Sequence, residues 1–253
     1  MRAPAAALWL GLVAMTLPAP SPVLAQAGTK LTYVPAFTIW DVTFGEPVTQ
    51  IPLSAVALIA CGTNGGPPSV PLGDFAEYAT CRSEASGLHE VFFTYDDEQD
   101  YIAKALEDEY RFAQGGTSIY AHPVIFTVLV DAGGLARGIR IVTDERASER
   151  DRRVAVRLSE NLKGRYSPWS PACEDLPATD GQLPVGAIFI HEVCTAEDPG
   201  GTTAMRLEAT YFRKKGQTSI NRETQKVQSN YFQSATRLEV VQLPYQPDTT
   251  PVR

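Results

Sequence analysis

The hydrophobic pattern of the chain is clearest between residues 122 and 144, where two apolar runs flank a short polar segment. The first run, residues 124–130, is rich in β-branched and aromatic side chains, and the second, residues 139–142, is rich in isoleucine and valine. Asp131, Gly133 and Gly134 lie between the runs and supply the chemistry of a turn. The pattern therefore predicts a β-hairpin.

Elsewhere the pattern predicts two helices and further strands. Apolar residues recur at helical spacing over residues 97–114, behind an acidic run, and over residues 148–164, which open with a Ser-x-x-Asp capping motif. Strand-like composition marks residues 31–44, 87–96, 186–193, 205–213 and 231–243. We therefore predict an α+β protein, with one or more antiparallel sheets and one or two packed helices.

The first 25 residues have the layout of a secretory signal peptide. Arg2 precedes an apolar run over residues 5–17, and small residues follow and end at Ala25. We expect cleavage between Ala25 and Gln26 and a periplasmic or secreted location. No later stretch has the length of a membrane-spanning helix, so we expect a soluble mature chain with no membrane span.

The net charge of the chain argues against nucleic acids as partners. The chain has 22 Lys and Arg residues against 29 Asp and Glu residues, a formal charge of −7. A nucleic-acid-binding protein usually carries a basic patch or a basic excess. We therefore expect no nucleic-acid partner.

The four cysteines all follow the predicted cleavage site, and an even number in an exported chain indicates disulfides. The spacing pairs Cys61 with Cys81 and Cys173 with Cys194. A zinc site is the alternative, but C-x-x-C pairs are absent and the histidines do not lie at ligand spacing, so we expect no metal and no cofactor. Residues 61–71 are rich in glycine and proline, which predicts a disulfide-stapled loop whose backbone amides could line a pocket.

Residues 71–81 and 184–194 match when their last cysteines are aligned. Both begin with proline, an aliphatic residue and glycine, and both end with a cysteine eight positions after the glycine. An internal duplication and a chance match both account for this, and a duplication predicts two related disulfide-stapled lobes. We expect a first α+β lobe at residues 26–164, a smaller, mainly β lobe at 165–243 and a disordered tail at 244–253.

The layout of a short helix after Phe44 and Gly45, two disulfide loops and a strand meander is similar to that of exported helix-plus-sheet modules. Such modules occur in outer-membrane assembly lipoproteins and in tandem-domain β-lactamase inhibitor proteins. Local support comes from the segment Phe44-Gly45-Glu46-Pro47 and the cysteine spacing, and no family motif accompanies them. The resemblance implies binding to proteins and no catalysis.

Candidate catalytic groups are few. Asp96 and Asp97 open an acidic run over residues 96–100 that could serve glycoside hydrolysis, although capping of the following helix also explains it. His89 and His122 are candidate bases, and no nucleophile motif accompanies them. We therefore expect a non-catalytic exported protein that binds a cell-envelope protein or a small ligand. The alternative is a secreted hydrolase that uses the acidic run.

Overall fold

The computed structural model describes residues 37–95, 117–120, 122–216, 218–220, 225–228 and 232–249. The chain divides into two compact units, Met1–Pro35 and Ala36–Arg253. Everything described below belongs to the second unit.

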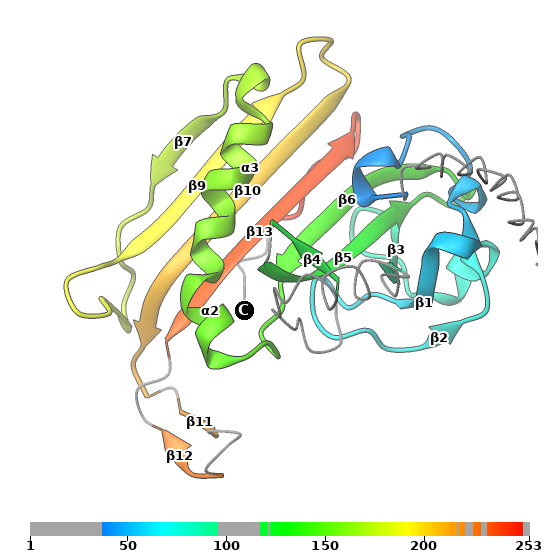
Figure 1. Ribbon diagram of the computed structural model, residues 1–253. Coiled ribbons are helices and arrows are strands. Elements are labelled where there is room, and N and C mark those ends of the chain that lie inside the picture. The colour runs from blue at the N-terminus through cyan, green and yellow to red at the C-terminus, as the bar shows by residue number, and fades with distance from the viewer. Residues whose placement is uncertain are drawn as a thin grey trace, which may run out of the picture. The chain divides into compact units, whose positions relative to one another are not determined.

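One antiparallel sheet dominates this unit (Figure 1). In the described residues it has eleven strands, of which nine follow the order β2-β1-β3-β5-β6-β13-β10-β9-β7, while β4 pairs with β5 and β8 pairs with β10. The strands are β1 (Val56–Cys61), β2 (Pro71–Leu72), β3 (His89–Tyr95), β4 (Ser118–Ile119), β5 (His122–Val130), β6 (Ala136–Thr143), β7 (Ala172–Asp175), β8 (Gln182–Leu183), β9 (Ile190–Glu197), β10 (Thr203–Lys214) and β13 (Gln233–Gln242). A separate hairpin pairs β11 (Ser219–Ile220) with β12 (Val227–Gln228).

The hairpin predicted from residues 122–144 is confirmed as β5 and β6. Phe126 lies opposite Ile141 in its register, and Asp131 accepts backbone hydrogen bonds from Gly133 and Leu135 in the turn. Gly134 adopts a φ of +81°, a conformation that favours glycine. The turn chemistry and the apolar runs thus specify the same structure.

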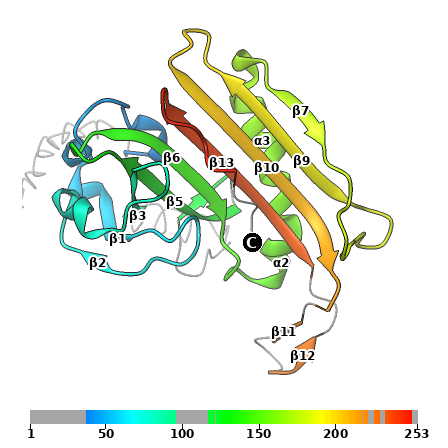
Figure 2. The same cartoon turned by 180° about the vertical axis from the view of Figure 1, so that it is seen from behind.

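The predicted helix at residues 148–164 is also confirmed. It consists of α2 (Glu149–Val154), the 3-10 turn η5 (Ala155–Arg157) and α3 (Leu158–Arg165), and the Ser148 hydroxyl caps α2 by accepting from the Asp151 amide. Leu158 and Leu162 are fully buried in the core. Figure 1 shows these helices lying across β9, β10 and β13, and Figure 2 shows the same strands from behind, with the helices on the far side.

The prediction of a strand at residues 31–44 is wrong for its described part. Residues 39–41 form the 3-10 turn η1 (Ile39–Asp41), because Asp41 accepts hydrogen bonds from the amide and the hydroxyl of Thr38. The turns η2 (Val48–Gln50), η3 (Leu53–Ala55) and η4 (Phe75–Thr80) follow. The buried residues Ile39, Val48 and Phe75 of these turns join the core. The helix predicted at residues 97–114 lies outside the described residues.

Both predicted disulfides are present. Cys61 at the end of β1 bonds to Cys81 after η4, and Cys173 on β7 bonds to Cys194 on β9. The first closes a loop beside the sheet, and the second joins two directly opposed residues of neighbouring strands. No helix in the described part of the chain is long and apolar enough to cross a membrane.

The two predicted lobes contribute to the same sheet, because β6 from the first pairs with β13 from the second. Of the two passages that match in sequence, residues 71–81 contain β2 and η4, whereas residues 184–194 lead into β9. Local structure therefore differs between them, and the duplication stays a prediction. The first part of the predicted disordered tail, residues 244–249, is described and packs on the sheet.

Candidate functional site

Charged residues follow one another across the sheet face opposite the helices. Alternation along the strands places Arg140 of β6 beside Glu239 of β13, and Glu239 beside Arg206 of β10. Successive strands thus present side chains of opposite charge, an arrangement that stabilises cross-strand pairs. Part of this row is buried: Arg140 is 1% exposed and Glu239 is 2% exposed.

Arg140 binds three carboxylates. Its Nη1 and Nη2 atoms donate to both carboxylate oxygens of Glu84, at 2.6 and 2.9 Å, and Nη1 lies 2.9 Å from Glu90 Oε1. Its Nε atom donates to Glu239 Oε1. Burial by itself would lower the pKa of Arg140, but the hydrogen bonds and charges of these carboxylates outweigh it and raise the pKa above its ordinary value. The guanidinium is therefore a permanent cation at the centre of the group.

Glu90 holds the loop that follows β1. Its carboxylate accepts hydrogen bonds from the Thr127 hydroxyl at 3.0 Å, from the Gly65 amide at 3.1 Å and from the Asn64 amide. A Cβ at Gly62 would lie 2.4 Å from the Glu90 side chain, so any larger residue there would displace the Glu90 carboxylate from its partners. The backbone amides of the glycine-rich loop therefore serve an internal carboxylate.

Residues 244–249, here called the C-terminal strap, reach the same place from the other end of the chain. The Asp248 amide donates to Glu239 Oε2 at 2.7 Å, and the Asn64 side-chain amide donates to Asp248 Oδ2 at 3.0 Å. Arg237 donates to the Asn64 carbonyl at 3.2 Å and to Glu239. The strap and the glycine-rich loop are thus joined through Asn64, Arg237 and Asp248.

We call Glu84, Glu90, Arg140, Arg237, Glu239 and Asp248 the charge cluster. It contains two guanidinium groups and four carboxylates, a formal charge of 2 minus 4, or −2. Buried ion pairs are tolerated where hydrogen bonds satisfy the charged atoms. Each carboxylate of the cluster accepts at least one hydrogen bond, so the group is a fixed polar floor rather than a set of vacant ligands.

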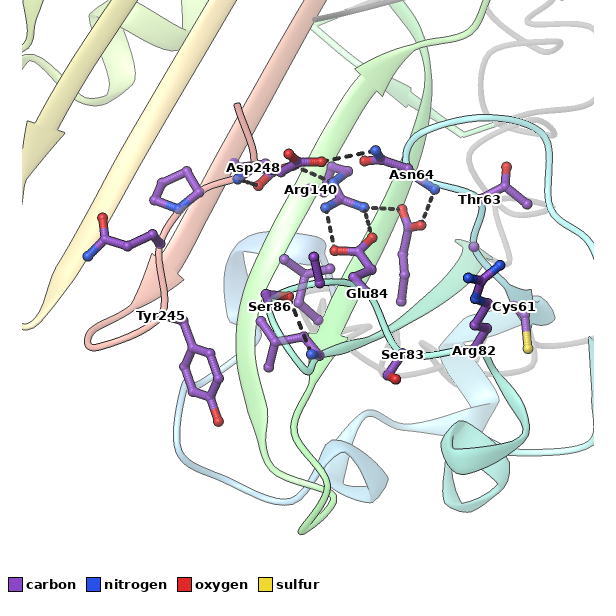
Figure 3. A pocket seen from close by; sticks show the side chains of 18 of the residues that line it. Cys61, Thr63, Asn64, Arg82, Ser83, Glu84, Ser86, Arg140, Tyr245 and Asp248 are labelled. Atoms are coloured by element: carbon purple, nitrogen blue, oxygen red, sulfur yellow. Dashed lines mark hydrogen bonds and ion pairs between the residues drawn. The ribbon is translucent and has the colours of Figure 1, made fainter. Parts of the chain in front are cut away.

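A cavity of about 1050 Å³ opens beside the charge cluster. Its walls are the glycine-rich loop after Cys61, residues 80–88 and the strap, while Leu88 and Leu129 add apolar surface. Figure 3 shows Glu84, Arg140, Asn64 and Asp248 gathered together, with Tyr245 and Arg82 on either side of them in this view. Exposed side chains of Ser83 and Ser86 also line the cavity. The site is therefore a polar hollow with a rigid, charged floor.

The candidate catalytic residues do not converge in the described structure. Asp96 and Asp97 lie outside the described residues. His89 pairs in register with Val130, at the opposite end of β5 from His122, which puts the two histidines roughly 26 Å apart at about 3.3 Å per residue. No shared acid–base site forms from these two residues.

Each histidine has a local structural role. His89 Nδ1 lies 2.6 Å from the Cys81 carbonyl, to which it donates, and its ring meets the edge of Tyr78. His122 is buried beside Asp151 and Ala155 of the helix. Burial lowers the pKa of His122, opposed by the charge of Asp151 and assisted by that of Arg157. These surroundings make His122 a neutral core residue at neutral pH.

A third histidine, His191, lies on β9 and contacts Glu208 of β10 through Nε2 at 3.0 Å. Four strand spacings separate β9 from β5, or roughly 19 Å at about 4.8 Å per spacing. In the described residues, the set of acids and cysteines that comes closest to a metal-binding arrangement consists of Cys173, Glu192 and Cys194. Their two sulfur atoms are bonded to each other, and Glu192 pairs with Lys163 at 2.9 Å, so they offer no thiolate ligands.

Sequence reasoning missed the charge cluster. Arg140 and Glu239 each alternate with apolar residues in strong strands, a pattern that indicates an exposed polar face. Arg140 finds two of its partners in Glu84 and Glu90, which are remote from it in sequence. The available signal was the occurrence of an arginine and a glutamate among apolar residues in two predicted strands, but only the register shows that the two lie side by side.

The chain matches no protein-family model, and no match was found among the curated proteins or the solved structures. Its function is therefore argued from the cavity and the charge cluster.

Proposed function

We propose that the protein is exported and acts by binding, with the cavity beside the charge cluster as its ligand site. The proposal is based on this cavity. Ligand sites are typically concave, with volumes of roughly 300–1,000 Å³ and a few fixed polar groups. The cavity of about 1050 Å³ lies just above that range.

The site is rigid on two sides. The Cys61–Cys81 disulfide fixes the loop that forms one wall, and Glu90 and Arg140 fix the floor through several hydrogen bonds each. Binding groups held in place before the ligand arrives lose little conformational entropy on binding. These features favour recognition of a polar ligand by an organised site.

Export is the second part of the proposal. The predicted signal peptide, with cleavage near Ala25, agrees with two disulfides that would persist in an oxidising compartment such as the periplasm. The binding site would then act in the cell envelope or outside the cell.

One experiment tests both parts: measurement of the intact mass of the protein isolated from its source without added ligand. Under denaturing conditions we expect the mass of residues 26–253 with two disulfides. Under native conditions we expect an additional bound mass. The full-length mass would contradict cleavage, and a native mass equal to the denatured mass would contradict a retained ligand.

A matched pair of variants places the ligand. Ala85 is exposed and lines the cavity, whereas Ala132 is exposed in the turn between β5 and β6. We expect Ala85→Trp to lose the bound mass because the indole takes up part of the cavity that the ligand needs, and Ala132→Trp to keep it. Loss in both variants, or in neither, would contradict binding in the cavity.

A further inference from the structure

We propose that the C-terminal strap occupies, within its own chain, a groove that also accepts an extended segment of a partner protein. The segment would carry an aromatic residue three positions before a carboxylate. This inference goes beyond the proposed cavity site, which the strap borders, and concerns the place that the strap itself fills.

The strap shows how such a segment would be held. Tyr245 packs against the buried cluster of Leu88, Leu129 and Val241, which gives an apolar anchor. Three residues later, Asp248 contacts Asn64 and Glu239 through its side chain and its amide. An aromatic anchor and a carboxylate anchor at fixed spacing are the elements of peptide recognition.

The strap can leave without disrupting the sheet. None of its residues takes part in the strand pairings of the described sheet, and β13 ends at Gln242. The Tyr245 amide donates to the Gln242 carbonyl within a local turn, and the other anchors involve side chains. Exchange of the strap for another segment therefore costs no ladder hydrogen bonds.

The contact that the strap makes with Arg237 is incomplete. Arg237 Nη2 lies 3.4 Å from Asp248 Oδ2, which is longer than the roughly 2.7–2.9 Å of a charge-assisted hydrogen bond. The Nε atom of the same guanidinium is buried without a hydrogen-bond partner, although Arg237 is 3% exposed. Such an atom carries a desolvation cost that a better-placed carboxylate would remove. Nη2 also donates to Asn64 Oδ1 and to Glu239, so both of its hydrogens are engaged, and a partner carboxylate would gain its new hydrogen bond at Nε.

The strap therefore determines how tightly a partner segment must bind in order to displace it. A tethered segment competes at an effective concentration on the order of millimolar. Weak peptides would be excluded, and a segment that completes the contact with Arg237 would displace the strap. Because the strap already occupies the groove, only segments that bind tightly enough to displace it are accepted.

The test uses the full-length protein and a fluorescent peptide with the sequence of Leu243 to Thr249, LPYQPDT. Fluorescence anisotropy would compare wild type with the double variant Tyr245→Ala, Asp248→Ala, in which the strap loses both anchors. We expect binding to the double variant to be at least about ten-fold tighter than binding to wild type. A peptide with alanine in place of the aspartate should bind the double variant about ten-fold more weakly.

Three results would overturn the proposal. They are no binding of LPYQPDT to a folded double variant, equal binding to wild type and double variant, and equal binding of the alanine peptide. Circular dichroism checks folding, and Asp248→Asn replaces the double variant if that fails to fold. A ligand retained in the native mass measurement would leave the cavity proposal standing after any of these results.

Discussion

Two glycines show how single residues build the site. Gly62 lies where a Cβ would collide with Glu90, and Gly65, with φ at +78°, lies where a Cβ would be 2.5 Å from Val142 Cγ2. Both positions let the loop backbone lie directly against the sheet and donate amides to the Glu90 carboxylate. The glycine-rich composition of this loop is explained by this close approach.

The first prediction concerns His122 and pH. Because burial lowers its pKa in the folded state below the ordinary value of 6.5, the unfolded chain takes up the proton first as pH falls. His122 thus makes the free energy of unfolding decrease below about pH 6.5, by at most about 1.4 kcal/mol for each pH unit, until the folded-state pKa is reached. Above that range the contribution is constant.

Urea unfolding at pH 7.5 and 5.5 would measure this contribution. We expect the wild type to lose more stability between the two pH values than His122→Gln, in which no group titrates at this position. Equal losses in the two proteins would show that His122 is protonated as readily in the folded chain as in the unfolded chain.

At the scale of elements, the two disulfides differ in their surroundings. Cys61 and Cys81 are both buried in the core, at 4% and 3% exposure. Cys173 lies on β7, an edge strand in which all four residues are exposed, and it pairs with the buried Cys194. Because thiol exchange requires access to a sulfur atom, exposure should decide the order of reduction.

We therefore predict that a dithiol reductant cleaves Cys173–Cys194 before Cys61–Cys81 under native conditions. Alkylation of the freed thiols at increasing times, followed by peptide mass spectrometry, measures the order. Labelling of Cys61 and Cys81 first would mean that the wall of the cavity opens more readily than the edge of the sheet.

The elements also show what the sequence could predict. The hairpin over residues 122–144 and the helix that begins after Ser148 have local signals, in turn glycines, a cap and a periodic apolar face, and both are confirmed. β1 was not predicted because apolar and polar residues do not alternate along it. Its first three residues are exposed or partly exposed, and only its last three are buried. The aromatic residues near Trp40 suggested a strand, yet side chains of a 3-10 turn pack there equally well.

At the scale of the whole described unit, the site depends on contacts between segments remote in sequence. Asn64, Arg140 and Asp248 belong to a loop after β1, to a central strand and to the strap, and a hydrogen-bond network joins them. No local pattern specifies that such residues meet, because strand order and register bring them together. The sequence therefore predicted the fold class and the covalent framework, whereas the charge cluster and the cavity required the structure.

A crystal structure of the protein isolated from its source with no ligand added would show directly whether the cavity holds a ligand. We expect electron density of a bound molecule in the cavity, within hydrogen-bond distance of groups such as Ser83, Ser86 or Glu84. Density for ordered water alone, in protein that also shows no bound mass, would contradict the claim that this cavity is a ligand site.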